Sequence, residues 1–266
     1  MSFHELAPTI DLARYVDGIW TLSQSQDGCH ESLVLPDGCV EIVFAVEGSF
    51  GLAGQLGPRD ARWPMVTVLG LATKPHGILY RGRAHMIGVR LTPAGAMRIV
   101  GTELSQLVNG AADGADILPA LASRFTGAIE DLLESRGPDR LHCELRAAVE
   151  CSKPIDPRIE NAASTLHARV RGDSIGAVAE DVGLSTRQLD RCFDRWFGVP
   201  PKFIDRVARF RRAFSLGMTQ PRTEWAAVAA HCGYADQSHL CREFLEFTHQ
   251  TPERMRLAMA SPSHYV

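Results

Sequence analysis

The fold of the C-terminal part is decided by two similar stretches, AEDVGLSTRQLDRCF at residues 179–193 and AAHCGYADQSHLCREF at residues 229–244. In each stretch an alanine stands four positions before a glycine, and a polar segment then opens a run that carries Leu, Arg and Phe at every second position. A helix that crosses another helix at a sharp angle needs a small residue at the contact and a glycine in the short turn, as in a helix-turn-helix. Two such units in tandem indicate DNA binding.

The two stretches are not equal copies. Arg191 lies eight residues after Gly183, whereas Arg242 lies nine residues after Gly233. The second turn is therefore one residue longer, and the polar residues that follow it also differ. We expect the two units to read different base sequences, as a non-palindromic pair.

The surrounding sequence sets the limits of this part. The segment SKPIDP at 152–157 is short, polar and interrupted by two prolines, so it predicts a domain boundary, with domains at 1–151 and 152–266. Within the second domain we expect helix-turn-helix units at about 174–198 and 222–248. A basic amphipathic helix at about 202–215 joins them.

Composition is that of an ordinary globular protein of 266 residues, with 45% hydrophobic and 22% charged side chains. The sequence has no apolar run long enough for a membrane span and no signal-peptide pattern, so we expect a cytoplasmic protein without a membrane partner. Charge is uneven: residues 1–151 hold 12 basic and 18 acidic side chains, whereas 152–266 hold 16 and 13. The resulting net charges of −6 and +3 favour contact with a polyanion through the second domain only.

The seven cysteines, an odd number, include no pair spaced C-x-x-C. A disulfide framework and a zinc knuckle are both disfavoured by this pattern. We therefore expect no metal and no cofactor.

The sequence pattern of the first domain changes from that of strands to that of helices near residue 92. From Ser32 to Leu91, short apolar runs alternate with turn signals such as Pro36-Asp-Gly38, which predicts a small antiparallel sheet or barrel. From about 93 to 151 apolar residues recur at three- and four-residue spacings, which predicts a helical linker region. The fold class is then α+β: a β-rich sensor or dimerisation domain with helices, followed by an all-α domain with two helix-turn-helix units.

The region from about Arg158 to Arg256 resembles the DNA-binding domain of the AraC/XylS family of bacterial transcription regulators. The strongest match is the run GYADQSHL at 233–240 with Arg242, Phe244 and Thr251-Pro252. The segment PDGCVEIVF at 36–44 resembles, more weakly, the N-terminal sensor-type domains of a subset of that family. The family usually has glycine after the second recognition helix, where this chain has His249. Histidine is tolerated in a left-handed cap at some cost.

A recognition helix presents the residues of its first turns to base edges in the major groove of double-stranded DNA. The resemblance implies contacts from the first helix by Arg187, Asp190 and Arg191, and spacing adds Thr186, Gln188 and Arg195. For the second helix it implies Gln237, Ser238, His239, Cys241 and Arg242. Lys202, together with the helix N-termini at Ser174 and Ser185, is a candidate for phosphate contacts, and two helices on one DNA face would occupy two successive turns, about 34 Å apart.

An effector site in the first domain is predicted with less support, because aromatic residues in a small β domain are more often core. Glu41 is flanked by Val40 and Ile42, so an inward-facing carboxylate would need a partner, for which Arg90 is a candidate. The candidate residues for a small-molecule effector are Trp20, Glu41, Trp63, His76, Tyr80 and Arg90, with His85 considered beside them.

The leading hypothesis is a sequence-specific transcription regulator, not an enzyme, whose first domain senses a small molecule or forms a homodimer. RNA polymerase would be a partner if the protein is an activator. One alternative is a DNA-binding enzyme, either metal-dependent or a cysteine-based repair protein. Another is a constitutive regulator whose first domain only dimerises.

Overall fold

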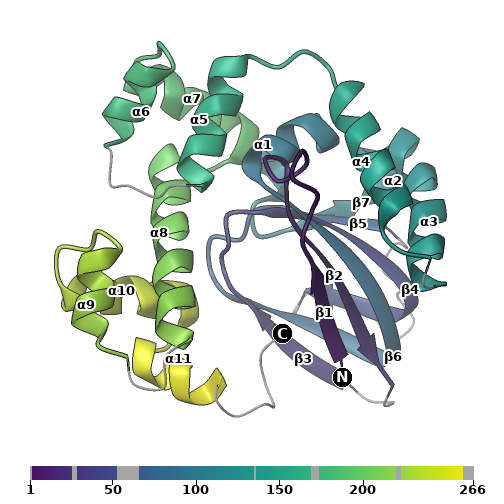
Figure 1. The fold of residues 1–266 in the computed structure, drawn as a ribbon, viewed down its shortest axis with the longest axis horizontal. Helices are drawn as coiled ribbons and strands as arrows, with labels where there is room; N and C mark the ends of the chain where they lie inside the picture. Colours follow the sequence, from purple (N-terminus) through teal and green to yellow (C-terminus); the bar gives the residue numbers. More distant parts are fainter. Residues whose placement is uncertain are drawn as a thin grey trace.

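The computed structural model describes residues 2–25, 29–52, 66–134, 136–168, 174–219 and 223–259. Within these residues, the first part of the chain forms one antiparallel sheet of seven strands in the order β1-β2-β6-β4-β5-β7, with β3 also paired to β6 (Figure 1). The strands are β1 (Ser2–Leu6), β2 (Val16–Gln24), β3 (Cys29–Val34), β4 (Val40–Leu52), β5 (Val66–Leu69), β6 (His76–Leu91) and β7 (Ala111–Asp113).

The long strand β6 organises the sheet. One of its edges pairs with β4, while its other edge pairs with β3 at residues 76–81 and with β2 at residues 84–91. At the pair Trp20–Gly88, a Cβ atom on the glycine would lie 2.0 Å from the indole ring. The ring of Trp20 therefore crosses β6 only because residue 88 has no side chain.

The two faces of the sheet carry different apolar clusters, as expected from the two-residue period of a strand. Ile19 and Phe44 belong to a cluster on one face, whereas their neighbours Trp20 and Val43 belong to a cluster on the other. The helices α3 (Pro119–Leu133) and α4 (Asp139–Glu150) cover the first face, where the ring of Phe125 lies edge-on to Phe44 at 6.0 Å. Shorter elements precede them: α1 (Pro93–Gly95), η1 (Ala96–Val100), η2 (Ser105–Leu107) and α2 (Gly114–Ile117).

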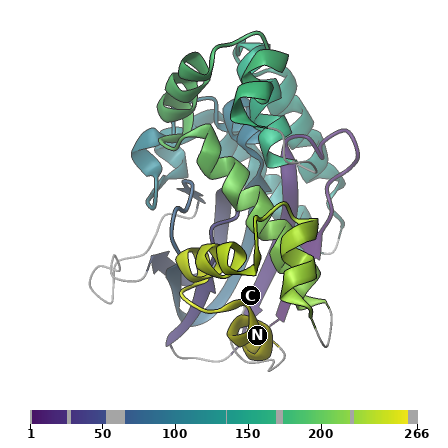
Figure 2. The same ribbon diagram turned by 90° about the vertical axis from the view of Figure 1, so that its left-hand side faces the viewer.

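The second part of the chain is helical. The 18-residue helix α8 (Pro201–Met218) stands beside the sheet, with one group of helices near each of its ends (Figures 1 and 2). The first group contains α5 (Pro157–His167), α6 (Ile175–Asp181) and α7 (Thr186–Phe197). The second contains α9 (Trp225–His231), α10 (Gln237–Thr248) and α11 (Pro252–Met259).

The predicted α+β fold class is confirmed. Strands also occur before the predicted β region, as β1 and β2, and the helical linker region contains the short strand β7, which pairs with β5. The joining helix runs from Pro201 to Met218, so it is longer at both ends than the predicted 202–215. One hydrophobic cluster crosses the predicted domain boundary, because it includes Ile42 of the sheet and Phe193 of α7.

Candidate nucleic-acid interface and adjoining cavity

The first helix-turn-helix unit is formed by α6 and α7. The alanine four positions before the glycine, Ala179, is buried, and its carbonyl accepts from the Leu184 amide at 2.8 Å. Gly183 between them has a φ of 69° in open space, a conformation that glycine adopts without steric cost. Ser185 then caps α7: its Oγ accepts from the Gln188 amide at 3.3 Å, and Gln188 Oε1 accepts from the Ser185 amide at 2.9 Å.

One face of α7 is exposed and the opposite face is buried. Leu189, Phe193 and Phe197 fill the core. The exposed residues of the first two turns include four of the predicted base contacts, Thr186, Arg187, Asp190 and Arg191.

Two further candidates on α7 already have partners. The side-chain oxygen of Gln188 is held in the cap of the helix, so this residue helps to begin α7. Arg195 donates from Nε to Glu103 Oε1 at 2.5 Å, which ties the end of α7 to the preceding domain.

The second unit, formed by α9 and α10, repeats this turn geometry. The buried Ala229 accepts from the Tyr234 amide at 2.9 Å, and Gly233 between them has a φ of 77°. Asp236 caps α10, its Oδ1 accepting from the His239 amide at 2.7 Å. Because α10 begins four residues after its glycine and α7 begins three after Gly183, the second turn is one residue longer, as predicted.

The candidate contacts on α10 differ in exposure. Gln237, Ser238 and Arg242 are exposed, whereas His239 and Cys241 are half-buried. The imidazole of His239 lies edge-on to the Tyr234 ring at 5.2 Å. His249 ends α10 with a φ of 57°, so the left-handed cap expected at this position is present.

Behind α10 lies a buried carboxylate that the sequence patterns did not single out. Glu243 Oε1 accepts from Arg206 Nε at 2.9 Å and from Arg209 Nη2 at 2.7 Å, both on α8. The guanidinium of Arg209 also lies 4.6 Å from the centre of the Tyr234 ring. In the sequence, this buried site is indicated only by an acidic residue that lies next to the core positions Leu240 and Phe244. These contacts fix the orientation of α10 on α8.

Lys202, the phosphate-contact candidate, lies in the first turn of α8 and is exposed. Its ammonium group is 3.2 Å from Asp205 Oδ2. A contact with a phosphate would therefore compete with this neighbouring carboxylate.

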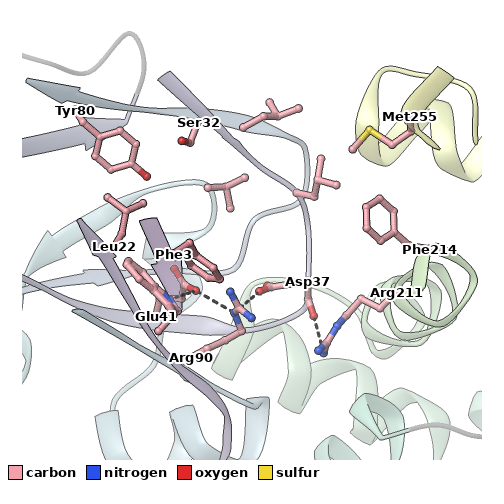
Figure 3. Close-up of a pocket in the computed structure, with 14 residues that line it drawn as sticks. Phe3, Leu22, Ser32, Asp37, Glu41, Tyr80, Arg90, Arg211, Phe214 and Met255 are labelled. Atoms are coloured by element: carbon pink, nitrogen blue, oxygen red, sulfur yellow. Dashed lines mark hydrogen bonds and ion pairs between the residues drawn. The ribbon is translucent and has the colours of Figure 1, made fainter. Parts of the chain in front are cut away.

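Four of the six effector candidates meet at one cavity of about 270 Å³ between the sheet and the helices α8 and α11 (Figure 3). These four are Trp20, Glu41, Tyr80 and Arg90. His76 and His85 lie in β6 but are not among the residues that line the cavity, and Trp63 lies outside the described residues. The facing wall comes from Arg211, Phe214 and Met255, which were not predicted.

The polar end of the cavity is centred on Glu41 and Arg90, the pair predicted from the sequence. Arg90 Nε donates to Glu41 Oε1 at 3.1 Å, and Trp20 Nε1 donates to the same oxygen at 3.1 Å. Asp37 Oδ2 lies 3.2 Å from Arg90 Nε, and Glu5 Oε1 lies 3.1 Å from its Nη1. Burial raises the pKa of Glu41, and the charge of Arg90 opposes only part of this shift.

Arg211 on α8 contacts residues of the sheet and of the loop before β4 at this end of the cavity. Its Nη2 donates to Asp17 Oδ2 at 2.7 Å, and its Nη1 lies 3.3 Å from the Asp37 carbonyl oxygen and 3.2 Å from His167 Nε2. Asp37 therefore contacts Arg90 through its carboxylate and Arg211 through its backbone.

Among the described residues, one group has the side chains of a metal site: Asp17, Cys39 and His167, whose ligand atoms lie within 4.8 Å of one another. The guanidinium of Arg211 contacts two of these three residues, so a positive charge already lies beside the group. Burial keeps the pKa of the Cys39 thiol well above its ordinary value, which disfavours the thiolate that a metal would need. The geometry fits a polar network better than a cation site.

Two family models match the chain. Residues 178–258 match a helix-turn-helix domain, and residues 4–113 match a domain of unknown function (DUF6597). No curated protein sequence matches the chain significantly. In the described part of the chain, no helix has both the length and the apolar character needed to span a membrane.

Solved structures with similar folds include three regulators. A transcriptional regulator with an AraC-type DNA-binding domain from Chromobacterium violaceum is 26% identical, with a TM-score of 0.37 over 40% of this chain and 96% of that one. The DNA-binding domain of AdpA, solved with a target DNA, is 24% identical, with a TM-score of 0.36 over 41% and 99%. ToxT from Vibrio cholerae is 12% identical, with a TM-score of 0.49 over 97% and 98%.

The fold and the family match define a DNA-binding protein of the helix-turn-helix class. The paired units on α8, with the residues quoted above, are those of the AraC type. Residues 178–258 therefore carry a helix-turn-helix domain of the AraC type.

Proposed function

We propose that this regulator binds double-stranded DNA with α7 and α10 in the major groove of two successive turns. The observation that supports this most directly is that both helices begin with an exposed polar face while their opposite faces are buried. Arg187 and Arg191 on α7, and Gln237 and Arg242 on α10, supply side chains that hydrogen-bond guanine or adenine edges.

The length of α8 bears on this geometry. Its 18 residues span about 27 Å by the rise of an α-helix. The centres of two successive major-groove turns are about 34 Å apart. The offset of α7 and α10 from the ends of α8, together with bending of the DNA, would make up the remainder.

We also propose that a small-molecule effector controls DNA binding through the cavity between the sheet and α8. Four predicted effector residues line it, and its opposite wall belongs to the helix that joins the two DNA-reading units. A ligand there would contact both parts of the chain. We further propose that this is a cytoplasmic bacterial protein and that it forms a homodimer. If it is an activator, it would also contact RNA polymerase.

Genomic footprinting with wild type and an Arg242→Ala variant tests the DNA-reading proposal. We expect the variant to lose occupancy at the wild-type sites and to relax the base preference of one half of each site. Glu246→Gln is the matched control, because Glu246 is exposed on the same helix and pairs with Arg206. Unchanged occupancy and site preference in Arg242→Ala would show that the contact assignment is wrong.

The alternative of a constitutive regulator predicts that no ligand stabilises the chain. A thermal-shift screen with the purified protein separates the two cases. A compound that raises the melting temperature of wild type but not of an Arg90→Leu variant would support control through the cavity.

A further inference from the structure

The cavity has an apolar body and one charged end. Leu22, Leu35, Phe214 and Met255 belong to its apolar walls, and Figure 3 shows Phe214 and Met255 opposite the strands that carry Tyr80 and Leu22. A volume of about 270 Å³ lies just below the range of roughly 300–1,000 Å³ that is usual for drug-sized ligands. The cavity therefore suits a small molecule with one ring system.

At the charged end, negative charge exceeds positive charge. Two carboxylates that line the cavity, those of Asp37 and Glu41, lie within 3.2 Å of the guanidinium of Arg90, and the exposed Glu5, which is not among the lining residues, lies 3.1 Å from the same group. The second guanidinium of the cavity, that of Arg211, is already paired with Asp17 at 2.7 Å. Both cations that line the cavity are thus matched, and the two lining carboxylates beside Arg90 leave a formal excess of one negative charge when Glu41 is ionised.

The excess of negative over positive charge at this end of the cavity determines which ligand charge is favoured. An anionic ligand would have to displace a carboxylate from an arginine and would then lie among the displaced negative charges. A protonated amine would instead meet carboxylates that share one guanidinium. It would also relieve the repulsion among them.

Aromatic rings beside the carboxylates favour the same ligand. Trp20 donates to Glu41, and the ring of Phe3 stacks on Trp20 with centroids 6.1 Å apart. Burial raises the pKa of Tyr80 to about 12, so its phenol stays neutral. The faces of such rings attract cations.

We propose that the cavity binds a small aromatic molecule that carries a protonated amine, with the amine contacting Asp37 and Glu41 in competition with Arg90. This rests on the proposed effector control and adds the chemical class of the effector. Because Asp37 also accepts from Arg211 through its backbone, movement of residue 37 on ligand binding acts directly on α8.

Three molecules with one skeleton provide the test: 3-phenylpropylamine, 3-phenylpropan-1-ol and 3-phenylpropanoate. Isothermal titration calorimetry on the full chain at pH 7 should give the tightest dissociation constant for the amine, at least tenfold below that of the propanoate. Absence of amine binding, or equal binding of the propanoate, would overturn the proposal.

Variants separate charge from shape. Glu41→Gln keeps the shape of the side chain, so it should weaken amine binding about tenfold and leave alcohol binding unchanged. Asp37→Asn should act in the same direction and serves if Glu41→Gln fails to fold. Glu47→Gln is the matched control, because Glu47 lies on the same strand, pairs with Arg83 and is not among the residues that line the cavity. Equal weakening of the amine and the alcohol in Glu41→Gln would refute a role for the charge.

DNA binding provides a separate readout. Glu41→Gln should still bind DNA in the absence of ligand, since the hydrogen-bond partners of Glu41 are Trp20 and Arg90 of the sheet and not residues of α8. Loss of amine binding with DNA binding retained would concern the ligand alone. Loss of DNA binding by wild type at every tested site would instead contradict the proposed function.

Discussion

The two helix-turn-helix units share a turn geometry but are built into the molecule differently. The core residues of the first unit, Leu189, Phe193 and Phe197, belong to the same hydrophobic cluster as the residues on one face of the sheet. Those of the second unit, such as Leu240 and Phe244, belong to a separate cluster with Phe210 of α8. The first unit is therefore coupled to the sheet by packing, whereas the second is coupled to it mainly through α8.

Backbone contacts strengthen this difference. The Leu104 amide donates to the Trp196 carbonyl at the end of α7, at 2.8 Å. Gly198, which ends α7 with a φ of 66°, packs so closely that an added Cβ would lie 2.9 Å from the Ser105 carbonyl oxygen. A change in the first domain can therefore reach α7 and α10 by different routes.

The largest expected effect comes from removing one buried ring in each unit. Phe193→Ala and Phe244→Ala should each lower the free energy of unfolding by about 3–5 kcal/mol, because both rings are fully buried. Hydrogen exchange should show lost protection in the sheet for Phe193→Ala, and loss confined to α8–α11 for Phe244→Ala. Equal loss of protection in the sheet for both variants would show that the two units are coupled to the sheet in the same way.

Buried carboxylates give the next largest effect. Glu243 holds α10 on α8, while Glu160 of α5 accepts from Arg98 Nε at 2.8 Å and so joins the two parts of the chain. Glu243→Gln removes the carboxylate that pairs with the half-buried Arg209, and Glu160→Gln removes the one that pairs with the half-buried Arg98, so each should cost about 1.5–3 kcal/mol in denaturant unfolding.

The two carboxylate variants should differ in DNA binding. Glu243→Gln should weaken DNA binding beyond its effect on stability, because α10 loses its fixed orientation, whereas Glu160→Gln should not. Glu150→Gln, an exposed change on α4, serves as the control. Identical DNA affinity for the Glu243→Gln variant and wild type would refute the positioning role of Glu243.

Acid should loosen the contact between α8 and the sheet. Burial alone would raise the pKa of Asp17, but the hydrogen bond with His167 and the charge of Arg211 hold it well below the ordinary value of 3.8. A depressed pKa contributes stability that is present above pH 3.8 and is lost as the pH falls through the folded value.

Asp17→Asn removes this dependence. The variant should be less stable by about 1–3 kcal/mol at pH 7, because Arg211 loses a charged hydrogen-bond partner. Below about pH 4 its unfolding free energy should fall less steeply than that of wild type. Asp194→Asn, an exposed change on α7, is the control. Parallel pH profiles for Asp17→Asn and wild type would show that Asp17 is not the source of the acid sensitivity.

The smallest effect is expected at the exposed pair Arg195–Glu103, whose arginine side chain is 73% exposed. Glu103→Ala should change the unfolding free energy by less than about 1 kcal/mol. Thermal denaturation at low and high salt measures this. A larger loss would mean that the ion pair, and not the packing around Phe193, couples the first unit to the rest of the chain.

The sequence predicted the helical domain in detail and the cavity only in part. The alanine and glycine of each turn and the capping residues Ser185 and Asp236 are local sequence signals. Both turns and the ends of α7 and α10 could therefore be predicted directly from the sequence. The pair Glu41–Arg90 was predictable because a charged residue inside an apolar strand needs a partner. Arg211 and Met255 could not be placed at the cavity, because no local pattern shows which helix packs against the second face of the sheet.

Selection of binding sites from random double-stranded DNA tests the central claim most directly, with wild type, Arg191→Ala and Arg242→Ala side by side. We expect a wild-type site of two unlike elements, centred about 10 base pairs apart. Each variant should relax a different element and lose about 1–3 kcal/mol of discrimination there. A palindromic wild-type site, or relaxation of the same element by both variants, would contradict a two-part reader on one chain.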